Sequence, residues 1–106
     1  MINRTSPNQI FAMQMLAIRK SLATTERFLA EDRADRELAN FSRQVIRSEL
    51  ETARKKGKQG WWNEKECNTE HLQNLLDAAY NRGDLTAVIT YASMLHARSV
   101  ADSTHQ

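Results

Sequence analysis

The sequence has little of what usually interrupts a helix or cross-links a chain. Among its 106 residues there are three glycines, one proline and one cysteine. A single cysteine, Cys67, excludes an internal disulfide and is typical of a reducing compartment. The scarcity of glycine and proline, together with the lack of β-branched runs, favours helices joined by short turns.

Long hydrophobic runs are also lacking. No stretch reaches the length of a membrane-spanning helix, and the first residues, MINRTSPNQ, do not have the character of a signal peptide. Hydrophobic residues make up 41% of the chain and charged residues 26%, close to the average for globular proteins. We therefore expect one all-α domain, residues 1–106, located in the cytoplasm and making no contact with a membrane.

The net charge of +2 hides an asymmetry between the two halves of the chain. Residues 1–60 carry 12 Lys/Arg against 7 Asp/Glu, whereas residues 61–106 carry 3 against 6. This distribution indicates an acidic partner for the first half, or docking of the two halves on each other.

Two long helices are expected within residues 6–57. Ser6, Pro7 and Gln9 form a capping-box start for the first helix. The second helix spans residues 31–56 and is closed by Gly57. Both helices show the alternating steps of three and four residues of a coiled-coil seam. These positions are Phe11, Met15, Ile18, Leu22, Thr25 and Leu29 in the first, and Ala34, Leu38, Phe41, Val45, Ser48 and Thr52 in the second.

The connection between the two helices leaves two alternatives. The seam breaks register between Leu29 and Ala34, which favours a turn at residues 30–33 with Asp32 as the next N-cap, and hence an antiparallel helical hairpin. Since this stretch contains neither Gly nor Pro, a single continuous helix is the other possibility, and it would have to dimerise to cover its seam. The second helix also carries a second apolar strip beside its seam. Either the C-terminal half or a second subunit must cover this strip, and the latter would make the protein a homodimer.

One face of the second helix carries a row of arginines. Such a row can bind phosphates or an acidic protein surface. It can also be a solvated face, because several arginines have an acidic residue four positions away. The row consists of Arg33, Arg36, Arg43, Arg47 and Arg54, and the spaced pairs are Asp32–Arg36, Arg33–Glu37, Arg47–Glu51 and Glu51–Lys55.

A Gly/Trp corner is expected at residues 58–68. Trp61 and Trp62 cannot share one helix face, so one is expected to be buried and its neighbour partly exposed. The buried tryptophan would seal the two halves of the protein. An exposed tryptophan beside the cations Arg54, Lys55, Lys56 and Lys58 would instead anchor a partner protein or stack on a base.

A C-terminal αα-hairpin is expected at residues 69–100, followed by a tail at 101–106. Asn68 or Thr69 caps a helix over 69–82, and Asp84 caps a helix over 85–99. The inward residues of the last helix are expected to be Leu85, Val88, Ile89, Ala92 and Leu95. The hairpin has some offsets of a DNA-binding helix-turn-helix, but its second helix has no Lys or Arg before Arg98, which argues against that function.

The sequence predicts no catalytic residues, metal or cofactor. Cys67 and His71 lie four residues apart, with His96 as a further candidate, but a zinc site needs a fourth ligand. A cysteine–histidine nucleophile lacks a third member and an oxyanion loop. The acidic residues Glu64, Glu66 and Glu70 have few acidic partners facing them, so a nucleotide phosphohydrolase fragment is only a minor alternative.

The C-terminal half resembles a module of uncharacterised small accessory proteins of tailed bacteriophages and prophages. The resemblance rests on the order KGxxGWW…C…EHL…GD…MLHxR, which runs from Lys56 through Trp61-Trp62, Cys67, Glu70-His71-Leu72 and Gly83-Asp84 to Met94–Arg98. It implies a phage setting in the cytoplasm of a bacterial host and no defined chemistry. Some such modules accompany nucleotide-pyrophosphohydrolase domains, whose acidic motifs are not found here.

These observations favour a non-enzymatic phage-type protein that binds and modulates, by inhibition, a bacterial host or defence protein machine. The expected contact surface combines the two tryptophans with the basic end of the second helix, at Arg54, Lys55, Lys56 and Lys58. The alternative is a nucleic-acid-binding accessory protein that uses the arginine row of the second helix.

Overall fold

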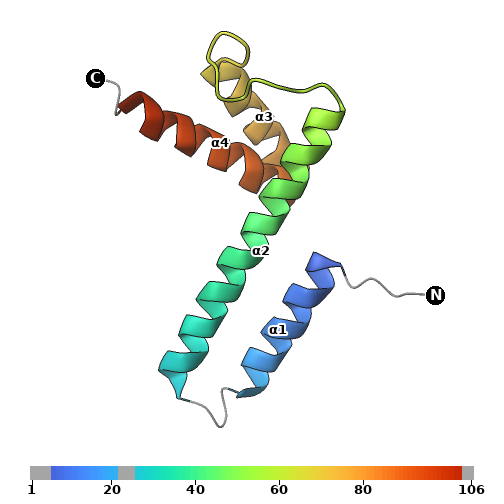
Figure 1. The fold of residues 1–106 in the computed structure, drawn as a ribbon, viewed down its shortest axis with the longest axis vertical. Helices are drawn as coiled ribbons and strands as arrows, with labels where there is room; N and C mark the ends of the chain where they lie inside the picture. The colour runs from blue at the N-terminus through green and yellow to red at the C-terminus, as the bar shows by residue number, and fades with distance from the viewer. Residues whose placement is uncertain (1–5, 22–25, 104–106) are drawn as a thin grey trace, which may run out of the picture. The chain divides into compact units, whose positions relative to one another are not determined.

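The computed structural model describes residues 6–21 and 26–103, which form four helices and no strand (Figure 1). The helices are α1 (Pro7–Ser21), α2 (Arg27–Lys55), α3 (Thr69–Asn81) and α4 (Leu85–Ser103). Contacts divide the chain into two compact units, residues 1–45 and 46–106. The all-α fold predicted from the sequence is confirmed.

Helix α1 begins with the predicted capping box. The backbone N–H of Gln9 donates to Ser6 Oγ at 3.2 Å, and the backbone N–H of Ser6 donates to Gln9 Oε1 at 2.9 Å. Pro7, which has no N–H to satisfy, takes the first helical position. The start of the helix is therefore determined by residues within one turn of it.

Helices α1 and α2 pair as a hairpin in the first unit, as the favoured alternative predicted (Figure 1). The rings of Phe11 and Phe41 stack with their centroids 4.4 Å apart. Nearer the turn, Arg33 Nη2 donates to Gln14 Oε1 at 2.8 Å. The ring stack joins two predicted seam positions, but the hydrogen bond uses Arg33 of the predicted arginine row, and the predicted seam residue Leu38 is 56% exposed. The structure therefore agrees with the predicted seam only in part.

The predicted turn at residues 30–33 is wrong. These residues lie inside α2, which already begins at Arg27, and Asp32 is not an N-cap. Ala30 is one of the most buried residues of the unit, so the register break at this point does not interrupt the helix. Leu29 belongs to α2 and not to the first helix. The predicted seam positions Leu22 and Thr25 lie outside the described residues.

Helices α3 and α4 form the predicted αα-hairpin in the second unit. Asn68 caps α3, its Oδ1 accepting from the backbone N–H of His71 at 2.7 Å. After α3, Gly83 has a φ of 74° and donates to Tyr80 O, while the N–H of Asp84 donates to Ala79 O, which is a Schellman ending. Asp84 Oδ1 then accepts from the backbone N–H of Ala87 at 3.1 Å and caps α4.

The buried face of α4 differs from the prediction. The predicted inward residues Leu85 and Ala92 are exposed, and α4 instead buries Ala87, Thr90, Met94 and Arg98. Small and apolar residues surround most of this helix, so its periodicity alone does not select the side that meets α3. In α3, by contrast, Leu72 and Ala79 are fully buried. Helix α4 also continues to Ser103, into the stretch expected to be a tail.

None of the helices in residues 6–21 and 26–103 is long and apolar enough to cross a membrane.

Candidate functional site

The corner after α2 begins with a glycine that ends the helix. Gly57 has a φ of 80°, its N–H donates to Arg54 O, and the N–H of Lys58 donates to Ala53 O, each at 2.9 Å. This Schellman ending matches the predicted stop at Gly57. Nothing lies within 4 Å of the Cβ that another residue would place here, so only the backbone conformation requires glycine.

Gly60 is required for two reasons. Its φ is also 80°, but here an added Cβ would lie 2.8 Å from Glu66 Cβ and 2.6 Å from Glu66 Oε2. Gly60 is buried, and its carbonyl accepts from the backbone N–H of Asn63 at 3.0 Å. The second glycine of the corner therefore allows the loop to fold back onto Glu66.

The two tryptophans that follow differ in exposure, but neither is buried, as one of them was expected to be. Trp61 is half-buried, whereas 66% of Trp62 is exposed. The four cations of the corner, Arg54, Lys55, Lys56 and Lys58, are exposed as well. A large aromatic side chain is thus presented to solvent within eight residues of four positive charges. The sealing role of Trp61 between the two halves stays a prediction.

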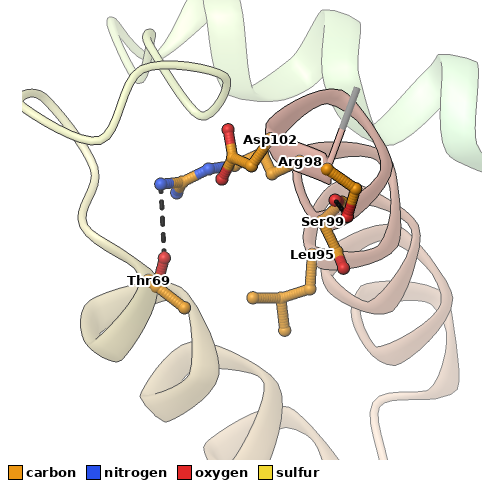
Figure 2. A pocket seen from close by; sticks show the side chains of 6 residues that line it. Thr69, Leu95, Arg98, Ser99 and Asp102 are labelled. Carbon is orange, nitrogen blue, oxygen red and sulfur yellow. Dashed lines mark hydrogen bonds between the residues drawn. The ribbon is translucent and has the colours of Figure 1, made fainter. Parts of the chain in front are cut away.

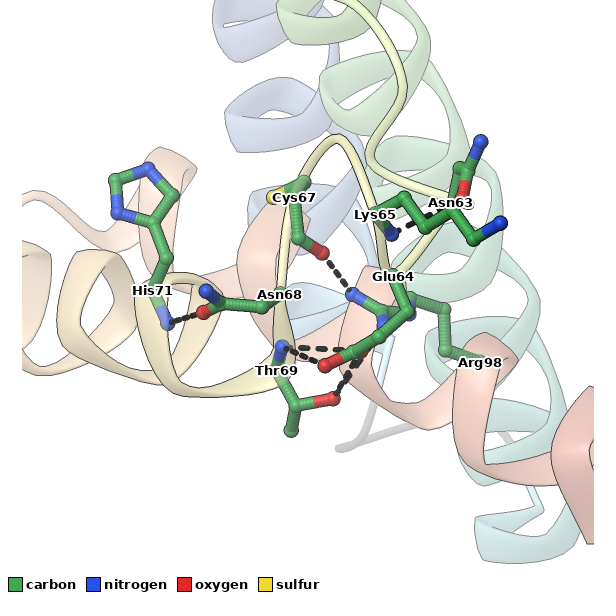
Figure 3. Close-up of polar contacts among 8 residues, drawn as sticks. All are labelled: Asn63, Glu64, Lys65, Cys67, Asn68, Thr69, His71 and Arg98. Carbon is green, nitrogen blue, oxygen red and sulfur yellow. Dashed lines mark hydrogen bonds and ion pairs between the residues drawn. The ribbon is translucent and has the colours of Figure 1, made fainter.

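Arg98 fixes the last part of the corner, the loop of residues 63–68 that leads into α3 (Figure 3). Its side chain is only 7% exposed and extends from α4 toward the loop. Nη1 donates to the carbonyl oxygen of Cys67 at 2.6 Å, and Nη2 donates to Glu64 Oε2 and, at 3.3 Å, to Thr69 Oγ1. One guanidinium group therefore joins α4, the loop and the start of α3.

Glu64 completes this network. Its carboxylate accepts from Thr69 Oγ1 at 2.8 Å and from the Thr69 backbone N–H at 3.1 Å, in addition to its ion pair with Arg98. Asn63 stabilises the same loop, because its Oδ1 accepts from the Lys65 backbone N–H. The loop that follows the exposed tryptophan is consequently held in one conformation by side chains from both of its ends.

Sequence reasoning missed this network. Arg98 was recognised only as the last residue of the MLHxR pattern, and Glu64 only as a member of an acidic cluster. The two residues are 34 positions apart, and no local spacing connects them. A signal did exist in α4, because Arg98 is the only Lys or Arg within that helix, and such an isolated cation on an apolar helix often has a buried acidic partner.

The arginines of the row differ in exposure and in whether they are paired with an acidic residue. In the first unit, Arg33 is half-buried and bonds Gln14, not the predicted Glu37. Arg36 pairs with Asp32 at 3.1 Å, as predicted. Both members of that pair are largely exposed, so the pair contributes little to stability but does reduce the charge available to a ligand.

The remaining arginines of the row are all exposed. Arg47 makes the predicted pair with Glu51 at 3.6 Å, and the predicted pair between Glu51 and Lys55 is not formed. Among the described residues, Arg43 in the first unit and Arg54 in the second have no acidic partner. The unpaired charge of the second unit therefore includes Arg54, which also belongs to the basic corner.

A shallow pocket of about 340 Å³ lies between the start of α3 and the end of α4 (Figure 2). Its main cation, the Arg98 guanidinium, is already bonded to Glu64 and Cys67. The other polar groups of its lining are the hydroxyl groups of Thr69, Ser99 and Ser103 and the carboxylate of Asp102. It is lined by Thr69, Leu95, Arg98, Ser99, Asp102 and Ser103.

The residues weighed for metal binding do not come together. Over residues 6–21 and 26–103, no group of three His, Cys, Asp or Glu side chains is placed to hold a metal ion. Figure 3 shows the His71 imidazole directed away from Glu64 and Arg98, and His96 is exposed on α4. Glu66 packs under Gly60, where Asn63 Nδ2 donates to its carboxylate.

The chain matches no protein-family model, no curated protein and no solved structure. Its own geometry therefore carries the functional argument. Most of the residues of the KGxxGWW…C…EHL…GD…MLHxR order have a structural role in the second unit: glycines end helices, Asp84 caps one, the Cys67 carbonyl accepts from Arg98, and Leu72 and Met94 are buried. Among the described residues of this order, Trp62, Lys56, Glu70 and His96 are exposed and their side chains make no hydrogen bond or ion pair.

Proposed function

We propose that this protein is a non-enzymatic, phage-type interaction protein that binds and inhibits a bacterial host or defence protein machine. The binding surface is the basic corner: Trp62 together with Arg54, Lys55, Lys56 and Lys58. Trp62 enters an apolar pocket on the partner, and the cations face acidic groups around that pocket. In this proposal the protein acts in the bacterial cytoplasm.

The observation that carries this proposal is the exposure of Trp62 on a fixed loop. Tryptophan is the side chain most often responsible for a large share of binding energy at protein interfaces. The loop after it is held by the Glu64–Thr69–Arg98 network, and the helix before it ends in a fixed turn at Gly57. A surface that is already ordered loses little conformational entropy on binding, which favours affinity.

The charges around Trp62 support an acidic partner surface. Among the described residues of the second unit, the ion pairs use Arg47, Arg82 and Arg98, and none uses Arg54, Lys55, Lys56 or Lys58. Those cations remain available to steer a negatively charged partner toward the tryptophan.

An affinity pull-down from bacterial lysate, with and without nuclease, tests the proposal. We expect one stoichiometric protein partner that survives nuclease treatment. Its affinity should fall about 30-fold or more with Trp62→Ala, as for an interface residue worth about 2 kcal/mol. Tyr80→Ala is the matched control, because Tyr80 is an equally exposed aromatic residue (70%) of the same unit. Equal loss in both variants would contradict a specific role for Trp62.

A nucleic-acid-binding function is the second candidate. It is favoured by the exposed arginines of α2 that lack an acidic partner among the described residues, Arg43 and Arg54. Contacts to phosphates make affinity fall steeply with salt concentration, whereas burial of a tryptophan does not. Enrichment that disappears with nuclease, and binding that falls steeply with salt and with Arg43→Gln but not with Trp62→Ala, would favour this function.

A further inference from the structure

The first unit leaves several large apolar side chains exposed to solvent. Among its described residues, the buried apolar side chains are Ile18 and Ala30. In α1, by contrast, Ile10 is 47% exposed, Met13 65% and Leu16 52%. A unit of about 45 residues is near the lower limit at which a single core supports folding, and such units commonly depend on oligomerisation.

The exposed residues of α1 form a second seam. Ile10, Met13 and Ala17 follow one another at steps of three and four residues, the spacing of a helix that packs along a neighbour. This strip lies roughly 120° around the helix from the side that contacts α2, at 100° per residue. Helix α1 therefore carries two packing faces, and α2 occupies one of them.

The charges of α1 restrict what can cover the free face. From Pro7 to Ile18 the helix has no charged residue, and its basic residues, Arg19 and Lys20, both lie in the last turn. An uncharged apolar strip is self-complementary and typical of permanent homodimer interfaces. Two copies of α1 in parallel would bring four cations together, whereas an antiparallel pair holds the cationic ends at opposite ends of the contact.

We propose that the Ile10–Met13–Ala17 face of α1 is a dimer interface, occupied by the same face of a second copy in antiparallel orientation. Met13 then lies near the two-fold axis, because it is close to the middle of α1. This arrangement places Ile10 of one copy opposite Ala17 of the second copy, since both lie on the same face at equal distances from its middle. The proposal is independent of the basic corner, which belongs to the other unit.

The first test is the mass of the full chain in solution, by size-exclusion chromatography with light scattering. We expect a dimer for the native sequence and a monomer for Met13→Glu, which would place two carboxylates together near the axis. Asn8→Glu is the matched control, because it adds the same charge to α1 about 140° away from Met13. It should remain dimeric. A monomeric native protein, or a dimer that survives Met13→Glu, would overturn the proposal.

Cysteine cross-linking tests the orientation and does not depend on a disruptive substitution. In a Cys67→Ser background, Met13→Cys should form an intermolecular disulfide on mild oxidation. Chains with Ile10→Cys should cross-link to chains with Ala17→Cys when the two are mixed, and neither should cross-link to itself. Self-cross-linking of both single variants would indicate a parallel pair, and a lack of cross-linking in all combinations would indicate another occupant. Either result contradicts the proposed interface.

Discussion

The helical hairpins of the two units differ in how many apolar side chains they bury and in how their ends are capped. In the second unit α3 and α4 bury Leu72, Ala79 and Met94, and every connection is closed by a cap or a side-chain network. Among the described residues of the first unit, a ring stack and a side-chain hydrogen bond join α1 and α2, and large apolar residues stay exposed on both helices. A hairpin with defined ends can fold on its own contacts, whereas one with exposed seams depends on what covers it.

Among the substitutions that test this difference between the units, Arg98→Ala should change the free energy of unfolding most. The substitution leaves the Cys67 carbonyl and the Glu64 carboxylate without their donor and removes a buried side chain. We expect the free energy of unfolding of the second unit to fall by about 3 kcal/mol, because the buried Arg98 side chain loses its packing and its charge-assisted hydrogen bonds to the Cys67 carbonyl and the loop. The ion pair itself contributes little of this, since the Glu64 side chain is 60% exposed. Urea unfolding followed by tryptophan fluorescence measures it. Arg82→Ala removes an exposed pair with Asp84 and should cost less than about 0.5 kcal/mol; equal costs would refute the role of the network.

A smaller effect is expected when the corner is forced open by Gly60→Ala. The added methyl group meets Glu66 and also forces a non-glycine residue to a φ of 80°, so we expect a loss of about 2 kcal/mol. Gly57→Ala is matched in φ but meets no atom within 4 Å, so it should cost about 1 kcal/mol. The difference in urea midpoint between the two variants isolates the contact with Glu66. No difference would show that the loop moves away at little cost.

In the first unit, Phe41→Ala removes the ring stack with Phe11. Because both rings are only half-buried, we expect a loss of about 1.5 kcal/mol, below the roughly 3–5 kcal/mol of a fully buried phenylalanine. Hydrogen exchange should show faster exchange for amides of α1 and of α2 before residue 46, with the amides of α3 and α4 unchanged. Equal acceleration in both units would mean that the chain unfolds as one cooperative unit.

The smallest expected effect concerns the N-cap of α3. Asn68→Ala removes the side-chain acceptor of the His71 N–H and should destabilise α3 by about 1 kcal/mol. Asn74→Ala, at an exposed position inside the same helix, should be neutral or slightly stabilising because alanine is the better helix former. Thermal unfolding followed by circular dichroism compares the two variants. A cost at Asn74 as large as that at Asn68 would argue against the cap.

Some features of the site could be predicted from the sequence, and others could not. The stop at Gly57 and a difference in exposure between Trp61 and Trp62 were predicted, since each depends on neighbouring residues. The division of the arginine row was predicted only in part. Arg36 and Arg47 found their acidic residues one turn away, but Arg33 bonds Gln14 of the other helix, and local spacing carries no information on that contact.

The sequence by itself determined the helical class, the caps at Ser6, Asn68 and Asp84, and the endings at Gly57 and Gly83. These features form between residues at most five positions apart, so a short pattern contains all of the interacting atoms. The tertiary structure decided the start of α2 at Arg27, the buried side of α4, and the burial of Arg98 against Glu64. Those outcomes depend on which faces the helices present to each other, and an almost uniformly apolar helix such as α4 leaves that choice to packing.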